Sequence, residues 1–210
     1  RNALRQAAAR VCAAHGELAC QGKALAPLGQ GHYALGRIDD ARRLTLEALT
    51  LARQSGDRLG QVSALNQLSL LSDNMAEHLK LYAEALPAAM AAGWVRGQAL
   101  VVGNLAETYR EAGLFNRARR LHRQAMDLRA GSEDRSTLVL SLCNLALIDV
   151  AVGQFEGARQ LLAQAAAHID AFSSPLDRGF AALVAAKTAL ASGRAAEALP
   201  LFDEARRIVG

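Results

Sequence analysis

Apolar residues recur at helical spacing along the whole chain, and the same landmarks return at nearly constant intervals. Four short apolar pairs begin at residues 28, 105, 145 and 185, and a glycine stands eight residues after the start of each. An alanine follows five residues after each glycine, and a second alanine follows seven residues later. Landmarks that align in four registers indicate an internal repeat of about forty residues. The glycines are Gly36, Gly113, Gly153 and Gly193, and the first alanines are Ala41, Ala118, Ala158 and Ala198.

Each repeat predicts two antiparallel helices. The glycine stands where the first helix must end, in the left-handed position that caps many helices. The alanines are small, so that the second helix can lie closely against the first. One hairpin cannot bury its apolar face alone, so neighbouring hairpins must stack. The pattern therefore predicts an all-α fold, an α-α superhelix in which about eleven helices form a right-handed solenoid of hairpins.

The predicted helices group into one unpaired second helix, residues 1–15, and five hairpins. The hairpins span residues 18–54, 57–92, 95–130, 134–171 and 175–208. No linker rich in proline or serine interrupts them, so we expect a single solenoid over 1–210. Because the pattern starts and stops inside a repeat, we also expect a fragment of a longer polypeptide.

The second hairpin departs from the frame. Leu68 to Ala85 covers 17 residue steps, three fewer than the corresponding 20 in the first repeat, and the glycine is missing. We expect the turn at Asp73 and Asn74, with Asn74 in the left-handed conformation that asparagine tolerates. A tolerated deletion and a change of curvature that shapes a site both explain the shortening. Three prolines inside predicted helices should each bend their helix, and these are Pro27, Pro87 and Pro200.

Composition narrows the class of protein. No apolar run reaches the roughly 18 residues of a membrane span, so we expect no membrane insertion. The net charge of +4 is small for 210 residues, and acidic residues are interspersed with the basic ones, which argues against direct nucleic-acid binding. Three cysteines without a CxxC motif favour unpaired, buried thiols in a reducing compartment, so we expect a cytoplasmic protein. They are Cys12, Cys20 and Cys143.

No arrangement of residues indicates catalysis. The sequence contains no phosphate-binding loop and no GxSxG turn, and the five histidines fall in different repeats. We interpret each histidine as a surface or helix-packing residue, and we predict no enzyme activity, no cofactor and no metal site. Five arginines between residues 117 and 129 are interpreted as part of a solvated outer face.

The third repeat carries the clearest family pattern, in Leu105, Ala106, Tyr109, Gly113, Phe115, Ala118 and Ala125. In these positions the chain resembles tetratricopeptide repeats. The standard unit has about 34 residues, and the longer form here, with the linker LARQSGD at 51–57, resembles the repeats of MalT-like transcription activators and bacterial signalling ATPases.

This resemblance implies a non-catalytic module that binds a protein or peptide, as the sensor or interaction region of a bacterial transcriptional regulator or signalling protein. The alternative is a free-standing scaffold or an adaptor like a co-chaperone. A small-molecule inducer is a second kind of ligand to consider. We also expect homo-oligomers through apolar faces at the two ends.

In such solenoids the first helix of each hairpin lines the concave face, where extended ligands lie. Asn104 and Asn144 occupy equivalent places there, and Gln67 is their equivalent in the second repeat. Asparagines at this place hold peptide ligands in proteins such as kinesin light chains, so the resemblance implies the same role for Asn104 and Asn144. The alternative is that each asparagine bonds a neighbouring helix. The predicted contact residues are Asn66, Gln67, Asn104, Glu107, Arg110, Asn144 and Leu147. Pro27 and Val184 fill the slot in the first and fifth repeats.

Overall fold

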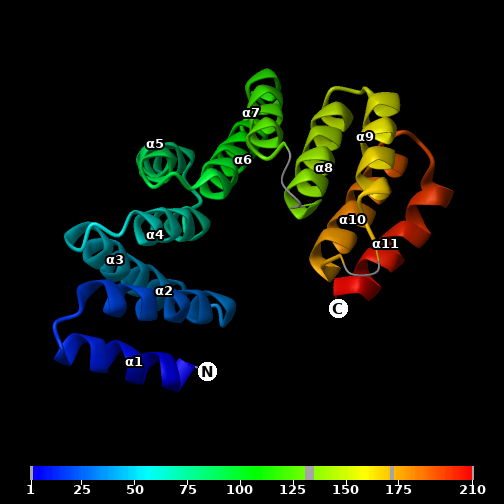
Figure 1. Ribbon diagram of the computed structural model, residues 1–210. Helices are drawn as coiled ribbons and strands as arrows, with labels where there is room; N and C mark the ends of the chain where they lie inside the picture. The colour runs from blue at the N-terminus through cyan, green and yellow to red at the C-terminus, as the bar shows by residue number, and fades with distance from the viewer. Residues whose placement is uncertain (1, 131–134, 171–172, 210) are drawn as a thin grey trace. The chain divides into compact units, whose positions relative to one another are not determined.

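The computed structural model describes residues 2–130, 135–170 and 173–209, and within these ranges it contains eleven α-helices and no strand (Figure 1). The helices follow one another through short turns, as the repeat predicts. Residues 134 and 171, which bound the fourth predicted hairpin, lie outside the described ranges. The chain divides into two compact units, residues 1–101 and 102–210. That they form one continuous solenoid stays a prediction.

The first unit contains α1 (Asn2–Ala14), α2 (Leu18–Ala34), α3 (Ile38–Gln54), α4 (Arg58–Leu70), α5 (Met75–Ala91) and the beginning of α6 (Val95–Glu111). Helices α2 and α3 pack as one hairpin and α4 and α5 as the next, while α1 packs on α2. Helix α4 contacts both α2 and α3, so the two hairpins stack. Apolar side chains from α1, α2 and α3 form the core here, and they are Ala9, Leu25, Leu28, Leu44, Ala48 and Leu51.

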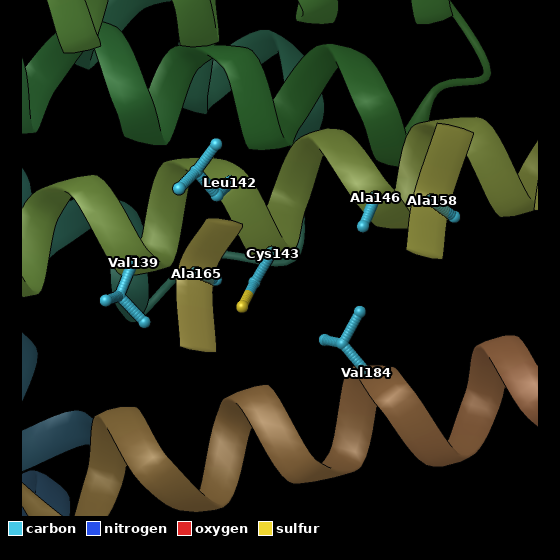
Figure 2. Packing of buried hydrophobic residues seen from close by; sticks show 7 residues of the cluster. All are labelled: Val139, Leu142, Cys143, Ala146, Ala158, Ala165 and Val184. Atoms are coloured by element: carbon cyan, nitrogen blue, oxygen red, sulfur yellow. The ribbon is translucent and has the colours of Figure 1, made fainter. Parts of the chain in front are cut away.

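The second unit contains the rest of α6, then α7 (Phe115–Leu128), α8 (Arg135–Ala151), α9 (Phe155–Ala167), α10 (Pro175–Ala191) and α11 (Ala195–Val209). Helices α8 and α9 form one hairpin and α10 and α11 another, and α10 packs against both α8 and α9. Figure 2 shows how α8, α9 and α10 meet: Cys143 points from α8 towards α10, and Val184 points back from α10.

The repeat landmarks have the roles that their spacing predicts. All four turn glycines have positive φ, between 71° and 78°, and end the first helix of their hairpin. The alanines at 41, 118, 158 and 198 are at most 1% exposed, because the second helix of each hairpin approaches the first too closely for a larger side chain. Ser174 caps α10, where its Oγ accepts from the amide N–H of Leu176 at 3.1 Å and Pro175 takes the first helical position.

The shortened repeat turns in a different way from the one expected. Asn74 does not adopt the left-handed conformation: its φ is −104°, and its Oδ1 accepts from the N–H of Ala76 at 2.8 Å, so that it caps α5. Arg42 of α3 closes the turn, because its Nη1 donates to Glu77 at 3.0 Å and its Nη2 to the carbonyl of Leu71 at 2.5 Å. In this hairpin, which lacks the turn glycine, Arg42 of the preceding hairpin therefore connects the end of α4 to the first turn of α5.

The prediction of unpaired cysteines is wrong for two of the three. Cys12 in the last turn of α1 and Cys20 in the first turn of α2 form a disulfide, with Cα atoms 5.6 Å apart. Their spacing of eight residues around a tight turn places them opposite each other on antiparallel helices. Cys143 is free and buried, as expected, and burial raises the pKa of its thiol to about 12. The disulfide removes the cysteine argument for a cytoplasmic location, which stays a prediction.

Candidate functional site

The predicted contact residues fall in both units, and each unit is described separately. Asn66 and Gln67 lie on α4 in the first unit. Asn104, Glu107 and Arg110 lie on α6 in the second unit, and the other two residues, Asn144 and Leu147, lie on α8.

Gln67 is a packing residue of the first unit. It is 5% exposed, and its amide reaches the backbone of α2. Its oxygen accepts from the N–H of Gln30 at 2.7 Å, and its nitrogen donates to the carbonyl of Ala26 at 3.2 Å. These two backbone groups would otherwise bond each other in a regular helix. Gln67 thus bridges α2 beside Pro27, and its amide is already satisfied.

Pro27 disturbs the preceding turn of the same helix. Proline has no N–H, so the carbonyl of Lys23 loses its regular helical donor, and the proline ring crowds that turn. The carbonyl of Pro27 itself accepts from Nη1 of Arg5 in α1 at 3.1 Å. Side chains from α1 and α4 therefore hold α2 on either side of the proline.

A groove lies between the first helices α2 and α4, with α3 as its floor. Its volume is about 290 Å³. Small side chains form most of its lining, including Ala19, Ala26, Ala48 and Ala52, and Lys23 and Asp57 are its charged residues. Asp57 caps α4, because its Oδ1 accepts from the N–H of Gly60 at 3.0 Å. We call this feature the α2–α4 groove.

In the second unit, Glu107 and Arg110 bind each other. Nε of Arg110 donates to both carboxylate oxygens of Glu107 at 2.9 Å, and this hydrogen bonding raises the pKa of Arg110. Both side chains are partly exposed. They form an ion pair on α6 in which both charged groups remain partly accessible to solvent.

A buried histidine, His122, interacts electrostatically with this pair, and the sequence does not indicate that its ring is unpaired. His122 of α7 is 1% exposed, and neither ring nitrogen has a hydrogen-bond partner among the described residues. Burial lowers its pKa to about 4, with opposing influences of Glu107, which raises it, and Arg110, which lowers it. The interpretation of this histidine as a helix-packing residue is confirmed, but the sequence carried no signal of its unpaired state.

The three predicted asparagines, Asn66, Asn104 and Asn144, are all half-buried, and Asn66 has an interaction partner within the protein. Asn144 makes no hydrogen bond to any of the described residues, so its amide has both donors and its acceptor available. Asn104 does have an interaction partner within the protein. Leu147, one turn after Asn144, packs partly against the core formed by α8, α9 and α10.

Three of the five arginines between residues 117 and 129 are exposed, as the interpretation of a solvated face predicts, and these are Arg117, Arg120 and Arg123. Arg117 stacks on the ring of Tyr109, with its guanidinium carbon 4.8 Å from the ring centroid, and remains exposed. Arg119 is half-buried and reaches Asp149 of α8 with 2.6 Å between Nη1 and Oδ1, and the Asp149 side chain is 6% exposed. Arg119 therefore has a structural role within the unit.

No group of three or more histidine, cysteine, aspartate and glutamate side chains among the described residues is placed to hold a metal ion. None of the described helices is both long and apolar enough to cross a bilayer.

Part of the chain matches a known family in sequence. Residues 95–171 match the tetratricopeptide repeat family. No curated protein matches the chain in sequence. Tetratricopeptide repeats are protein-interaction modules, and their fold is generally a non-catalytic scaffold.

Solved structures share the fold of the whole chain. BtubC (BKLC) from P. vanneervenii aligns at a TM-score of 0.77 with 20% identity, over 99% of this chain and 89% of that one. A putative kinesin light chain with nearly identical TPR-like repeats from Podosopora anserina aligns at 0.66 with 18% identity, over 89% and 93% of the two chains. A signal transduction ATPase with a tetratricopeptide repeat sensor from Pyrococcus horikoshii aligns at 0.67 with 14% identity, over 91% of this chain but 32% of that protein.

Proposed function

We propose that this chain, which contains tetratricopeptide repeats, is the protein- or peptide-binding region of a bacterial signalling protein or transcriptional regulator. Its ligand lies on the face formed by the first helices of the hairpins, which we call the first-helix face. In the second unit this face presents Asn104, Glu107 and Arg110 on α6 and Asn144 on α8. The module itself catalyses no reaction and holds no cofactor.

The available amide of Asn144 is the observation that carries this proposal. A half-buried amide with no partner among the described residues is suited to pair with the N–H and C=O of an extended peptide. Such bonds grip a backbone without reading its side chains, and the Glu107–Arg110 pair then adds recognition of charge. Gln67 leaves this set, because α2 uses its amide.

Peptide selection on the full chain tests the site. Peptides selected from a random displayed library would be measured against the wild type and against Asn144→Ala. We expect affinity to fall about five- to thirtyfold, because one or two hydrogen bonds are lost at about 1 kcal/mol each. Gln164→Ala, which removes an exposed amide from the second helix α9, is the matched control and should change nothing. A wild type that selects no peptide, or full affinity after Asn144→Ala, would refute the proposal.

The sensor role has a separate test. In the Pyrococcus horikoshii protein the repeats are named as a sensor, and a sensor must respond to its ligand with a change of state. Small-angle scattering with the selected peptide at saturation should show a changed radius of gyration. An unchanged radius would favour the alternative, a scaffold or adaptor that does not change state when its ligand binds.

A further inference from the structure

Helix α1 is held against the α2–α3 hairpin by very little apolar surface. Among its residues 3–14, whose side chains are described, only Ala9 and Cys12 are buried. Its two large apolar side chains, Leu4 and Val11, are 77% and 58% exposed. Because the hydrophobic effect grows with the apolar area removed from water, two small side chains contribute little to the docking of a whole helix.

The packing beneath α1 is also incomplete. A depression of about 360 Å³ opens between α1, α2 and α3, and its lining on α1 includes Ala9 and Ala13. In the described part of the chain, one side-chain hydrogen bond links α1 to α2, from Nη1 of Arg5 to the carbonyl of Pro27 at 3.1 Å. Helix α1 has 13 residues, and isolated helices shorter than about 12–15 residues are marginal in water. Its order therefore depends on staying docked.

The disulfide between Cys12 and Cys20 is thus the strongest connection between α1 and the hairpin. It joins the last turn of α1 to the first turn of α2. Cys12 is 7% exposed, whereas Cys20 is half-buried, so a small thiol reaches the bond from the side of Cys20. Exposed disulfides are the labile ones, and disulfides that stabilise a core resist reduction.

The face that α1 covers on the hairpin is apolar. Leu25 and Leu28 of α2 and Leu44 of α3 lie in one buried cluster with Ala9, and the three leucines are 2–9% exposed. We call these three residues the leucine face. Docking and release of α1 therefore distinguish two states that differ in exposed apolar surface.

We propose that the Cys12–Cys20 disulfide is a redox-sensitive latch, and that its reduction releases α1 from the hairpin and exposes the leucine face. A thiolate of a dithiol reductant attacks the sulfur of Cys20, and the sulfur of Cys12 leaves as a thiolate that takes up a proton. The second thiol of the reductant then displaces the sulfur of Cys20. The protein gains two electrons and two protons, and the reductant becomes a cyclic disulfide. The latch stands on the first unit alone and does not depend on the peptide site.

Thiol counting and hydrogen exchange on the full chain test the latch. In denaturant the oxidised protein should show one free thiol, that of Cys143, and protein reduced beforehand with dithiothreitol should show three. Exchange of the α1 amides should become faster by about thirtyfold or more on reduction, the factor expected for opening a loop of this length. A dye that fluoresces on apolar surfaces should bind more strongly to the reduced protein, and oxidised glutathione should restore the slow exchange.

Three variants separate the disulfide from the other contacts. Cys12→Ala removes the latch, so it should show fast α1 exchange and strong dye binding without any reductant. Cys143→Ala removes the buried free thiol and keeps the disulfide, so it is the matched control and should follow the wild type in both redox states. Arg5→Gln removes the hydrogen bond to Pro27, and its α1 should stay docked while the disulfide is intact.

Four results would overturn the proposal. They are three free thiols in the oxidised protein, unchanged α1 exchange after complete reduction, equal dye binding by Cys12→Ala and the oxidised wild type, and equal acceleration of exchange in α1 and α11. The last result would show that reduction unfolds the whole chain and does not release one helix.

Discussion

His122 offers the sharpest test of the packing in the second unit. Its ring is 1% exposed and both nitrogens lack hydrogen bonds among the described residues, so protonation would place an unpaired charge in the core. The pKa of His122 is about 4 in the folded protein, whereas an unfolded histidine titrates near 6.5. Replacement by leucine removes the titrating group and keeps an apolar side chain of similar size.

The sign and size of the effect follow from proton linkage. Between about pH 6.5 and pH 4 the unfolded chain binds a proton at this residue and the folded chain does not, so the stability contributed by His122 falls as the pH falls. At pH 5 the loss is about 2 kcal/mol relative to pH 7.5, and the full loss below pH 4 is about 3 kcal/mol. His122→Leu should lack this loss. It should also be more stable than the wild type at pH 7.5, because two unsatisfied polar atoms leave the core.

Urea unfolding followed by circular dichroism at pH 7.5 and pH 5 measures the difference. The wild type should lose about 2 kcal/mol more than His122→Leu between the two conditions. His15→Gln, which removes an exposed histidine in the turn after α1, should behave like the wild type and controls for general charge effects. Equal losses in the wild type and His122→Leu would refute the view that this ring is buried and neutral.

Three further perturbations test the packing elsewhere. Gly29→Ala would place a Cβ 2.7 Å from Oγ1 of Thr45, so we expect about 1–3 kcal/mol of destabilisation and a lower melting temperature in calorimetry; an unchanged melting temperature would contradict the close approach of α2 and α3. Arg119→Met leaves the buried carboxylate of Asp149 without its cation and should cost about 3 kcal/mol in urea unfolding, and a loss below about 1 kcal/mol would mean that the pair is weak. Reduction of the disulfide between α1 and α2 releases a short loop worth about 2–3 kcal/mol, so hydrogen exchange in α1 should speed up while α11 stays unchanged.

The repeat could be read from the sequence because its landmarks act locally. A glycine with positive φ ends a helix by its own backbone, and an alanine allows a close helix whatever its distant neighbours are. These local effects recur at four of the five hairpins. The turns at Gly36 and Gly153 and the burial of Ala118 are therefore as the pattern predicts.

The candidate site was only partly predictable, for the opposite reason. A side-chain amide is available to a ligand only if no backbone N–H or C=O of a neighbouring helix already pairs with it. Gln67 and Asn144 occupy equivalent places in the repeat, yet the backbone of α2 pairs with the amide of Gln67 and no described residue pairs with that of Asn144. The spacing of residues within one repeat does not indicate which backbone groups of a neighbouring helix need a side-chain partner.

The sequence by itself thus determined the class of fold, the hairpin as its unit and the turns that end the first helix of the four regular hairpins, because glycine and alanine act through the backbone of their own repeat. Only the tertiary structure decided the pairing of Cys12 with Cys20, the closure of the shortened repeat by Arg42 and the unpaired burial of His122. Each of these depends on which side chains two or three helices bring together, and a contact between helices is a property of their packing, which no single repeat encodes.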